Sequence, residues 1–180
     1  MREELTLSMA VKKIAWGYVL IHSAINLGVV DILPDWLGYY FMLVAIRKIQ
    51  EEEESVGLLE PLAKILIVWN SLVWGTKITG WNLSLFPFAI VINVIGIYFH
   101  FQLLTNLANV AMRHGSERGK SILVLRTVET LMNTVLTVMV YMEIAQGWMI
   151  AVAAVGLIAV IWLCSALFGL AKELGNEVAV

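Results

Sequence analysis

Apolar residues follow one another in long runs along this chain, and short polar segments separate the runs. Most of the runs approach the roughly 20 residues that an α-helix needs to cross a hydrocarbon core of about 30 Å. The pattern predicts six transmembrane helices, near residues 14–33, 36–49, 62–79, 85–112, 121–144 and 148–170. We therefore expect an all-α fold, in which residues 1–180 form a single polytopic membrane domain, a bundle of six transmembrane helices.

Turn-forming residues separate the runs. Pro34 ends the first run, because proline disfavours helix at the residue before it and fits the first turn of a new helix. Asp35 is placed to cap that new helix; the alternative is that it attracts cations to an entrance at the outer surface. Gly80 opens the turn after the third run, and the polar loop 113–120 (RHGSERGK) joins the fourth run to the fifth. The runs therefore pair as helical hairpins with short connections.

The second run is short for a transmembrane helix. Residues 36–49 make about 21 Å of helix, which is less than the roughly 30 Å thickness of the hydrocarbon core. We expect this helix to continue through Gln50 and the Glu51–Glu54 run into the headgroup region. The alternative is a re-entrant segment.

Basic residues are distributed unevenly between the two ends of the predicted spans. Ten of them fall at the end that carries both termini, and Lys77 alone falls at the other. The ten are Arg2, Lys12, Lys13, Arg47, Lys48, Lys64, Arg113, Arg118, Lys120 and Lys172. Cytoplasmic loops carry an excess of Lys and Arg, whereas Trp and Tyr gather at both interfaces, as Trp36, Tyr39 and Tyr40 do at the opposite end. We therefore predict that both termini are cytoplasmic.

The composition agrees with a membrane protein and argues against several other classes. Hydrophobic residues make up 60% of the chain and charged residues 14%, against about 25% charged residues in soluble domains. The net charge of −2 and the lack of a basic patch with interleaved aromatics argue against a nucleic-acid partner. The single cysteine, Cys164, has no internal disulfide partner, and its bland interpretation is a small residue packed in a helix.

Polar side chains recur midway along four of the predicted spans. Lipid offers no hydrogen bonds, so such groups face the bundle interior, a partner or a cavity. Their similar depth is where transporters tend to hold their substrates. The pattern predicts a substrate- or ion-binding site made of Arg126, Glu129, Asn133, His22, Asn26, Asn70 and His100. The alternative is that these groups only form hydrogen bonds between helices.

Glu129 is the most costly of these residues to place in a membrane. An ionised glutamate at the centre of a span costs roughly 2.5–3.5 kcal/mol. Arg126, three residues earlier, would offset part of that cost, or Glu129 would be protonated, because burial disfavours the charged form. A metal site made of His22, His100 and Glu129 is conceivable, but no ligand spacing requires it, and we expect neither a metal nor a cofactor.

The opening hairpin resembles a recurrent pattern in small multi-pass bacterial membrane proteins, an uncharacterised family. The stretch INLGVVDILPDWLGYYFMLVAIRKI contains an apolar arm, a Leu-Pro-Asp turn, a Gly-Tyr pair and a second apolar arm. The matching residues are Leu33, Pro34, Asp35, Trp36, Leu37, Gly38 and Tyr39. This resemblance implies the bacterial cytoplasmic membrane but no function. In size and span count the chain is also similar to the substrate-binding subunits of energy-coupling-factor transporters, a likeness of architecture only.

The function that these patterns favour is binding or transport of a small solute or ion at a polar site midway through the bilayer. The chain lacks the HExxH, GxSxG and P-loop motifs, so an enzyme is disfavoured and no catalytic residue is assigned. One alternative is an accessory or regulatory membrane subunit without catalysis, and another is an intramembrane enzyme acting on a lipid. The expected partners are the lipid bilayer, the solute or ion, and a second copy or a partner subunit.

Overall fold

The computed structural model describes residues 6–23, 26–27, 30–31, 34–80, 86–142 and 146–177. Within these ranges the chain forms six α-helices, which confirms the predicted all-α class. They are α1 (Leu7–His22), α2 (Asp35–Ile49), α3 (Glu60–Thr79), α4 (Phe86–Arg113), α5 (Arg118–Tyr141) and α6 (Gln146–Glu177). A 3-10 helix, η1 (Glu54–Leu59), precedes α3, and two short strands, β1 (Asn26–Leu27) and β2 (Val30–Asp31), lie between α1 and α2.

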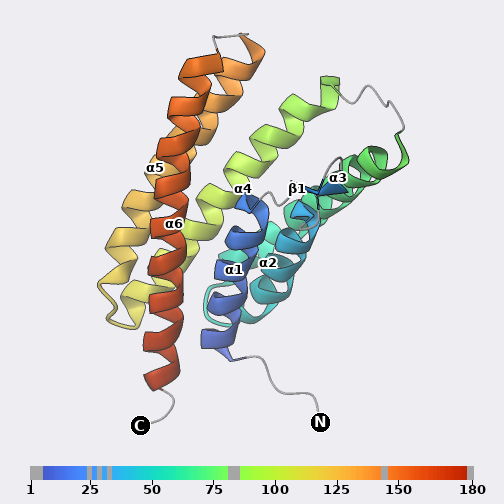
Figure 1. Ribbon diagram of the computed structural model, residues 1–180. Coiled ribbons are helices and arrows are strands. Elements are labelled where there is room, and N and C mark those ends of the chain that lie inside the picture. The colour runs from blue at the N-terminus through green and yellow to red at the C-terminus, as the bar shows by residue number, and fades with distance from the viewer. Residues whose placement is uncertain are drawn as a thin grey trace.

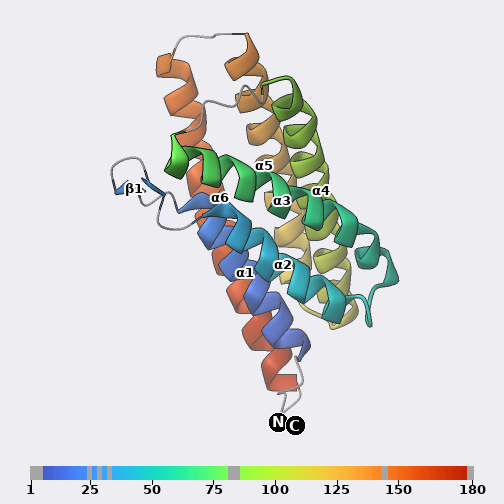
Figure 2. The same ribbon diagram turned by 90° about the vertical axis from the view of Figure 1, so that its right-hand side faces the viewer.

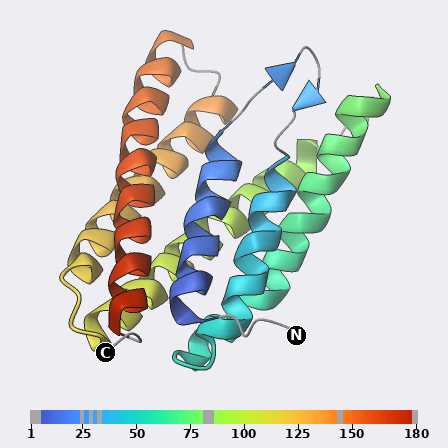
Figure 3. The same cartoon turned by 60° about the horizontal axis from the view of Figure 1, so that its bottom comes forward.

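Successive helices run in opposite directions, so the bundle has two distinct ends (Figure 3). Figure 1 shows α5 and α6 along one flank and α1, α2 and α3 along the other, with α4 crossing between them. α1 packs against both α2 and α6, and α5 packs against α4 and α6. This arrangement surrounds a core of buried apolar side chains from all six helices.

Among the described residues, four helices are long and apolar enough to cross a membrane. These segments are Glu54–Thr79, Phe88–Arg113, Arg118–Tyr141 and Gly147–Asn176. Many of their large apolar side chains face outward, among them Val91, Trp148 and Trp162. Outward apolar surface of this extent suits lipid rather than water. The chain is therefore built as a membrane protein, in agreement with its composition.

The helix predicted over residues 14–33 requires correction. α1 begins at Leu7, where the Thr6 side chain accepts a hydrogen bond from the backbone N–H of Met9 at 3.2 Å. The helix ends at His22, and β1 then pairs with β2 in an antiparallel hairpin. The mixed polar character of residues 7–13 concealed this start, because Ala10 and Val11 are buried on one face while lysines occupy another.

The other helix ends show which turn signals are effective. α2 ends at Ile49, so the expected continuation through Gln50 and the following glutamates is wrong; a turn and η1 occupy that stretch. α3 ends where Gly80 takes a left-handed conformation with φ of 68°, which glycine adopts without strain. α6 continues to Glu177, past the end predicted at residue 170.

Two glycines bring α1 and α2 unusually close together. A Cβ atom built on Gly17 would lie 2.9 Å from the backbone oxygen of Gly38, and one built on Gly38 would lie 2.7 Å from the backbone oxygen of Gly17. Small residues at helix contacts are the usual means by which membrane helices approach one another. The residues that follow the two glycines, Tyr18 and Tyr39, are buried in the interior as a result.

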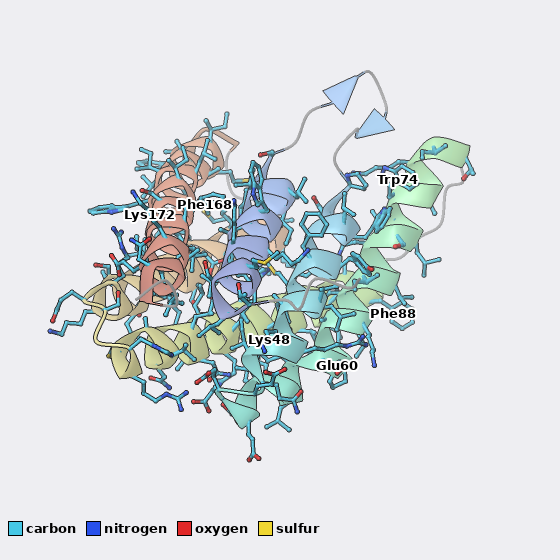
Figure 4. All side chains as sticks on the ribbon, turned by 90° about the horizontal axis from the view of Figure 1, so that it is seen from below. Lys48, Glu60, Trp74, Phe88, Phe168 and Lys172 are labelled. Carbon is cyan, nitrogen blue, oxygen red and sulfur yellow. The ribbon has the colours of Figure 1, made fainter. Side chains whose placement is uncertain are left out.

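Charged residues gather at one end of the bundle, called here the charged end, which carries the start of α1, the end of α6 and the α2–α3 and α4–α5 connections (Figures 1 and 2). Figure 4 shows Lys48 and Glu60 at the α2–α3 connection. The ion pairs here are Arg47–Glu60 at 3.1 Å, Lys64–Glu60 at 2.8 Å, Arg113–Glu53 at 2.5 Å, Arg118–Glu173 at 2.6 Å, Lys120–Glu117 at 2.8 Å and Lys48–Glu51.

Candidate functional site

A cavity of about 360 Å³, called here the central cavity, lies between α1, α2, α3, α4 and α5. Its polar lining comes from all five helices: His22, Asp35, Tyr39, Asn70, Asn93, His100, Glu129, Asn133 and Thr137. Its apolar lining includes Leu66, Ile92 and Leu136, with the ring of Trp69 beside them. The cavity therefore falls within the range of about 300–1,000 Å³ that is usual for small-molecule sites.

Glu129 is the most unusual group in this lining. It is only 3% exposed, and its Oε1 accepts a hydrogen bond from Nδ2 of Asn133, one turn further along α5, at 3.1 Å. Its Oε2 is buried and has no hydrogen-bond partner among the described residues. A buried acceptor without a partner costs about 1–3 kcal/mol, and more when it is charged, so the described residues leave this oxygen at a cost that they do not offset.

Arg126 does not meet Glu129, although the sequence placed them one turn apart. Its Nη1 donates to Oγ1 of Thr105 at 2.8 Å, and its guanidinium carbon lies 4.2 Å from the centre of the Phe101 ring. Both partners are on α4, and Arg126 is absent from the cavity lining. The expected offset of the Glu129 charge by Arg126 is therefore wrong, and Arg126 instead joins α5 to α4.

His100 is held between two tyrosine hydroxyls. The Oη of Tyr18 lies 3.0 Å from Nδ1 of His100, and the Oη of Tyr39 lies 3.2 Å from Nε2. A neutral imidazole has one donor and one acceptor nitrogen, so one hydroxyl accepts from the ring while the other donates to it. His100 is 6% exposed and both of its nitrogens are bonded, so its ring is fixed in orientation at the cavity wall.

His22 keeps one ring nitrogen available. Its Nδ1 lies 3.0 Å from the backbone oxygen of Tyr18, and since a carbonyl can only accept, Nδ1 carries the hydrogen. Nε2 is then an acceptor. The ring also stacks on Tyr18, with ring centres 6.0 Å apart and planes inclined by 14°. In its neutral form His22 therefore has Nε2 as an acceptor that bonds none of the described residues.

The two remaining predicted site residues differ in what the structure says of them. Asn70 lines the central cavity, and its Nδ2 donates to the backbone oxygen of Leu66 at 2.8 Å, which leaves its side-chain oxygen as the acceptor. Asn26 lies in β1, opposite Asp31, and its side chain falls outside the described part of the structure. The central cavity thus brings together His22, Asn70, His100, Glu129 and Asn133.

A second cavity of about 210 Å³ adjoins the first on the α6 side. It shares His22, Glu129, Asn133 and Leu136 with the central cavity. The rest of its lining is apolar: Met132, Ala153, Gly156, Leu157 and Val160. The polar groups shared by the two cavities therefore have an apolar space beside them.

Three groups that line the cavity or bond its lining were missed or differently assigned in the sequence. Tyr39 was grouped with the interface aromatics, yet it is buried and bonds His100. Tyr18 precedes His22 by four residues, a spacing that places both on one face of a helix and was a usable signal. Asp35 was assigned to helix capping, yet it lines the central cavity.

The site offers acceptors of several kinds, from carboxyl and amide oxygens to an imidazole nitrogen. The described residues contain no group of three or more His, Cys, Asp or Glu side chains placed to hold a metal ion. No protein-family model, curated protein or solved structure matches this chain. Its class is therefore defined by its own structure, which is that of an all-α membrane protein whose helices surround an acceptor-rich cavity.

Proposed function

We propose that this protein binds or transports a small solute or ion in the central cavity. The single observation that supports this most is Glu129, which lines the cavity and whose buried Oε2 has no hydrogen-bond partner among the described residues. Structural hydrogen bonding explains His100, since its two nitrogens are satisfied within the protein. It does not explain a membrane-buried carboxyl that keeps one acceptor unused.

We also propose that all six helices cross the membrane and that both termini are cytoplasmic. The helices alternate in direction (Figure 3). By the bounds of the helices, every basic residue assigned to the cytoplasm that the structure describes lies in a connection or in the adjacent turns of a helix at the charged end. α1 and α2 have 16 and 15 residues, or about 24 and 22 Å of helix, so the β1–β2 hairpin would complete their crossing. The resemblance of the opening hairpin, with its Leu-Pro-Asp turn, to small bacterial membrane proteins favours the bacterial cytoplasmic membrane.

A second candidate is an enzyme acting on a membrane lipid, and one observation favours it. An apolar groove of about 340 Å³ is lined by Lys64, Ile65, Val68, Trp69, Leu72 and Ile92. Trp69 and Ile92 also line the central cavity, so the outer groove and the cavity that contains His22 and Glu129 share these two lining residues. A lipid substrate would enter by that route, whereas a solute would enter from water.

The proposed function is tested by thiol accessibility in reconstituted liposomes. Thr137→Cys places a thiol in the cavity lining, and Val138→Cys places one at the same depth on a surface that is 47% exposed toward lipid. Both are made in a Cys164→Ala background. Thiolate is the reactive form and does not form in hydrocarbon, so we expect neutral methyl methanethiosulfonate to modify the residue 137 thiol much faster.

The sidedness of the reaction then separates binding from movement. Membrane-impermeant thiosulfonates applied inside or outside the liposomes should reach the residue 137 thiol from at least one side. Reaction from one side only indicates a binding site, and reaction from both indicates a pathway. Equal, slow modification of the two thiols would overturn the proposal and favour a protein whose polar groups serve only helix packing.

The second candidate, an enzyme acting on a lipid, is tested by Ile92→Trp. This substitution should close a lateral route past Trp69 and leave access from water unchanged.

A further inference from the structure

The charge balance of the central cavity is one-sided. Its lining contains two carboxyl groups, Asp35 and Glu129, and neither lysine nor arginine among the described residues. Arg126, the nearest basic residue along α5, is held by Thr105 and Phe101 on α4. An anion would therefore enter a site whose described lining has no lysine or arginine, whereas a cation would meet the carboxyl group of Glu129.

The size of the cavity and its ligands favour an organic cation over a bare metal ion. About 10–15 Å³ of probe-occupied volume holds one water molecule, so the 360 Å³ of the central cavity exceeds the need of a single ion many times over. Inorganic divalent ions need several closely spaced ligands, and no cluster of three such side chains exists in the described structure. An ammonium group needs only a few acceptors around its N–H or N-methyl hydrogens.

The surroundings of Glu129 match the two parts of such a molecule. The polar residues His22, Glu129 and Asn133 lie where the two cavities adjoin, and the second cavity beyond them is apolar. The ring of Trp69 lines the central cavity, and aromatic faces attract cations within about 6 Å of the ring centre. A charged head would contact Glu129 while a short apolar tail fills the second cavity.

We propose that the central cavity takes a small organic ammonium ion with an apolar tail, with Glu129 as its counter-charge. The inference rests on the proposed function, because it assigns a ligand class to the same cavity. Asn133 is a positioning residue here: its amide holds one carboxyl oxygen of Glu129 and leaves the other without a partner among the described residues. Acceptors on His22 and Asn70 complete the set available to the head group.

The test measures the charge preference of the cavity with three thiol reagents of known charge. They are a trimethylammonium thiosulfonate (cation), a sulfonate thiosulfonate (anion) and methyl methanethiosulfonate (neutral). The target is Thr137→Cys, which leaves the Glu129–Asn133 bond intact. Dividing each rate by the neutral rate removes differences in thiol reactivity. One charge two turns away should favour the cation about tenfold over the neutral reagent, and Glu129→Gln should abolish that preference.

A second measurement does not depend on how well the Glu129→Gln variant folds. In protein that keeps Glu129, butylammonium should slow modification by the neutral reagent, whereas butan-1-ol, of the same length but uncharged, should not. If the neutral reagent enters but neither charge preference nor protection by butylammonium appears, the proposal of an ammonium ligand is overturned. The proposal that the cavity binds or transports a solute is then unaffected. If no reagent reaches the residue 137 thiol, the proposed function itself is overturned.

Discussion

The charged end and the central cavity treat carboxylates in opposite ways. At the charged end Glu53, Glu60 and Glu173 each face a basic side chain within 3.1 Å. In the central cavity Glu129 bonds the amide of Asn133 and has no basic partner among the described residues, although Arg126 lies one turn away on the same helix. The chain thus pairs carboxylates with basic side chains at the charged end, where water already stabilises their charge. In the interior, where an ionised carboxylate costs more free energy, Glu129 has no such partner among the described residues.

This difference indicates what each region is for. An exposed ion pair contributes about 0–1 kcal/mol, so the charged end mainly fixes how the helix ends sit and which side of the membrane they face. A buried carboxyl without a cation lowers stability, and proteins keep such groups chiefly at functional sites. Four substitutions test this comparison.

The largest effect is expected at the close contact between α1 and α2. Gly38→Val forces α1 and α2 apart, because even a Cβ there would lie 2.7 Å from the backbone oxygen of Gly17. Overpacking of this kind costs about 3 kcal/mol, measured by thermal or denaturant unfolding in detergent. Gly75→Val is the matched control, since a Cβ on Gly75 would meet nothing within 4 Å. Equal losses in the two variants would contradict the close contact.

Tyr39→Phe should have the next largest effect. It removes the hydroxyl that bonds Nε2 of His100 and leaves a buried ring nitrogen unpaired, at a cost of about 2 kcal/mol. The neighbouring Tyr40 is 49% exposed, so Tyr40→Phe should leave the unfolding midpoint nearly unchanged. If both variants behave alike, the bond between α2 and α4 does not contribute to stability.

Glu129→Gln should raise the stability of the ligand-free protein by about 1 kcal/mol. The amide oxygen can still accept from Asn133, and a buried charge is lost. Glu173→Gln should instead lower stability slightly, because Glu173 accepts from Arg118 and Ser116 at the charged end. Opposite signs in the two unfolding curves support the comparison, and a loss from Glu129→Gln as large as that from Tyr39→Phe would refute it.

The smallest effect is expected from Arg118→Gln, which breaks the ion pair with Glu173. The loss should be at most about 1 kcal/mol, and it should vanish in 1 M NaCl, where charges are screened over about 3 Å. Lys172→Gln, one residue from Glu173, serves as the control. A loss that persists in high salt would mean that Arg118 acts through packing instead.

Sequence patterns located five helices well because their ends carry strong local signals. Pro34 precedes α2, Gly80 ends α3, and the 113–120 loop separates α4 from α5. α1 was misplaced because its first turns are stabilised by a Thr6 cap and by burial of Ala10 and Val11 against neighbouring helices. A hydropathy pattern does not register tertiary contacts of that kind.

The sequence brought out several residues that line the central cavity, but not the direction in which each side chain points. Placing polar residues at mid-span by helical rise brought out His22, Asn70, His100, Glu129 and Asn133, which the central cavity unites. Arg126 shows the limit of this reasoning. Residues three apart differ by about 60° around a helix. That angle allows Arg126 to contact Thr105 and Phe101 on α4 while Glu129 lines the central cavity. Only the packing of neighbouring helices decides between these directions.

The contact between α1 and α6 closes the bundle on itself. Oγ of Ser8 donates to the backbone oxygen of Ala171 at 2.5 Å, and the rings of Trp16 and Phe168 meet edge to face at 5.5 Å. The order of the helices around the bundle is therefore nearly circular, and the point at which the chain starts is arbitrary for packing. A permuted gene that joins α6 to α1 by a short linker and opens the chain at Ser116 should specify the same molecule.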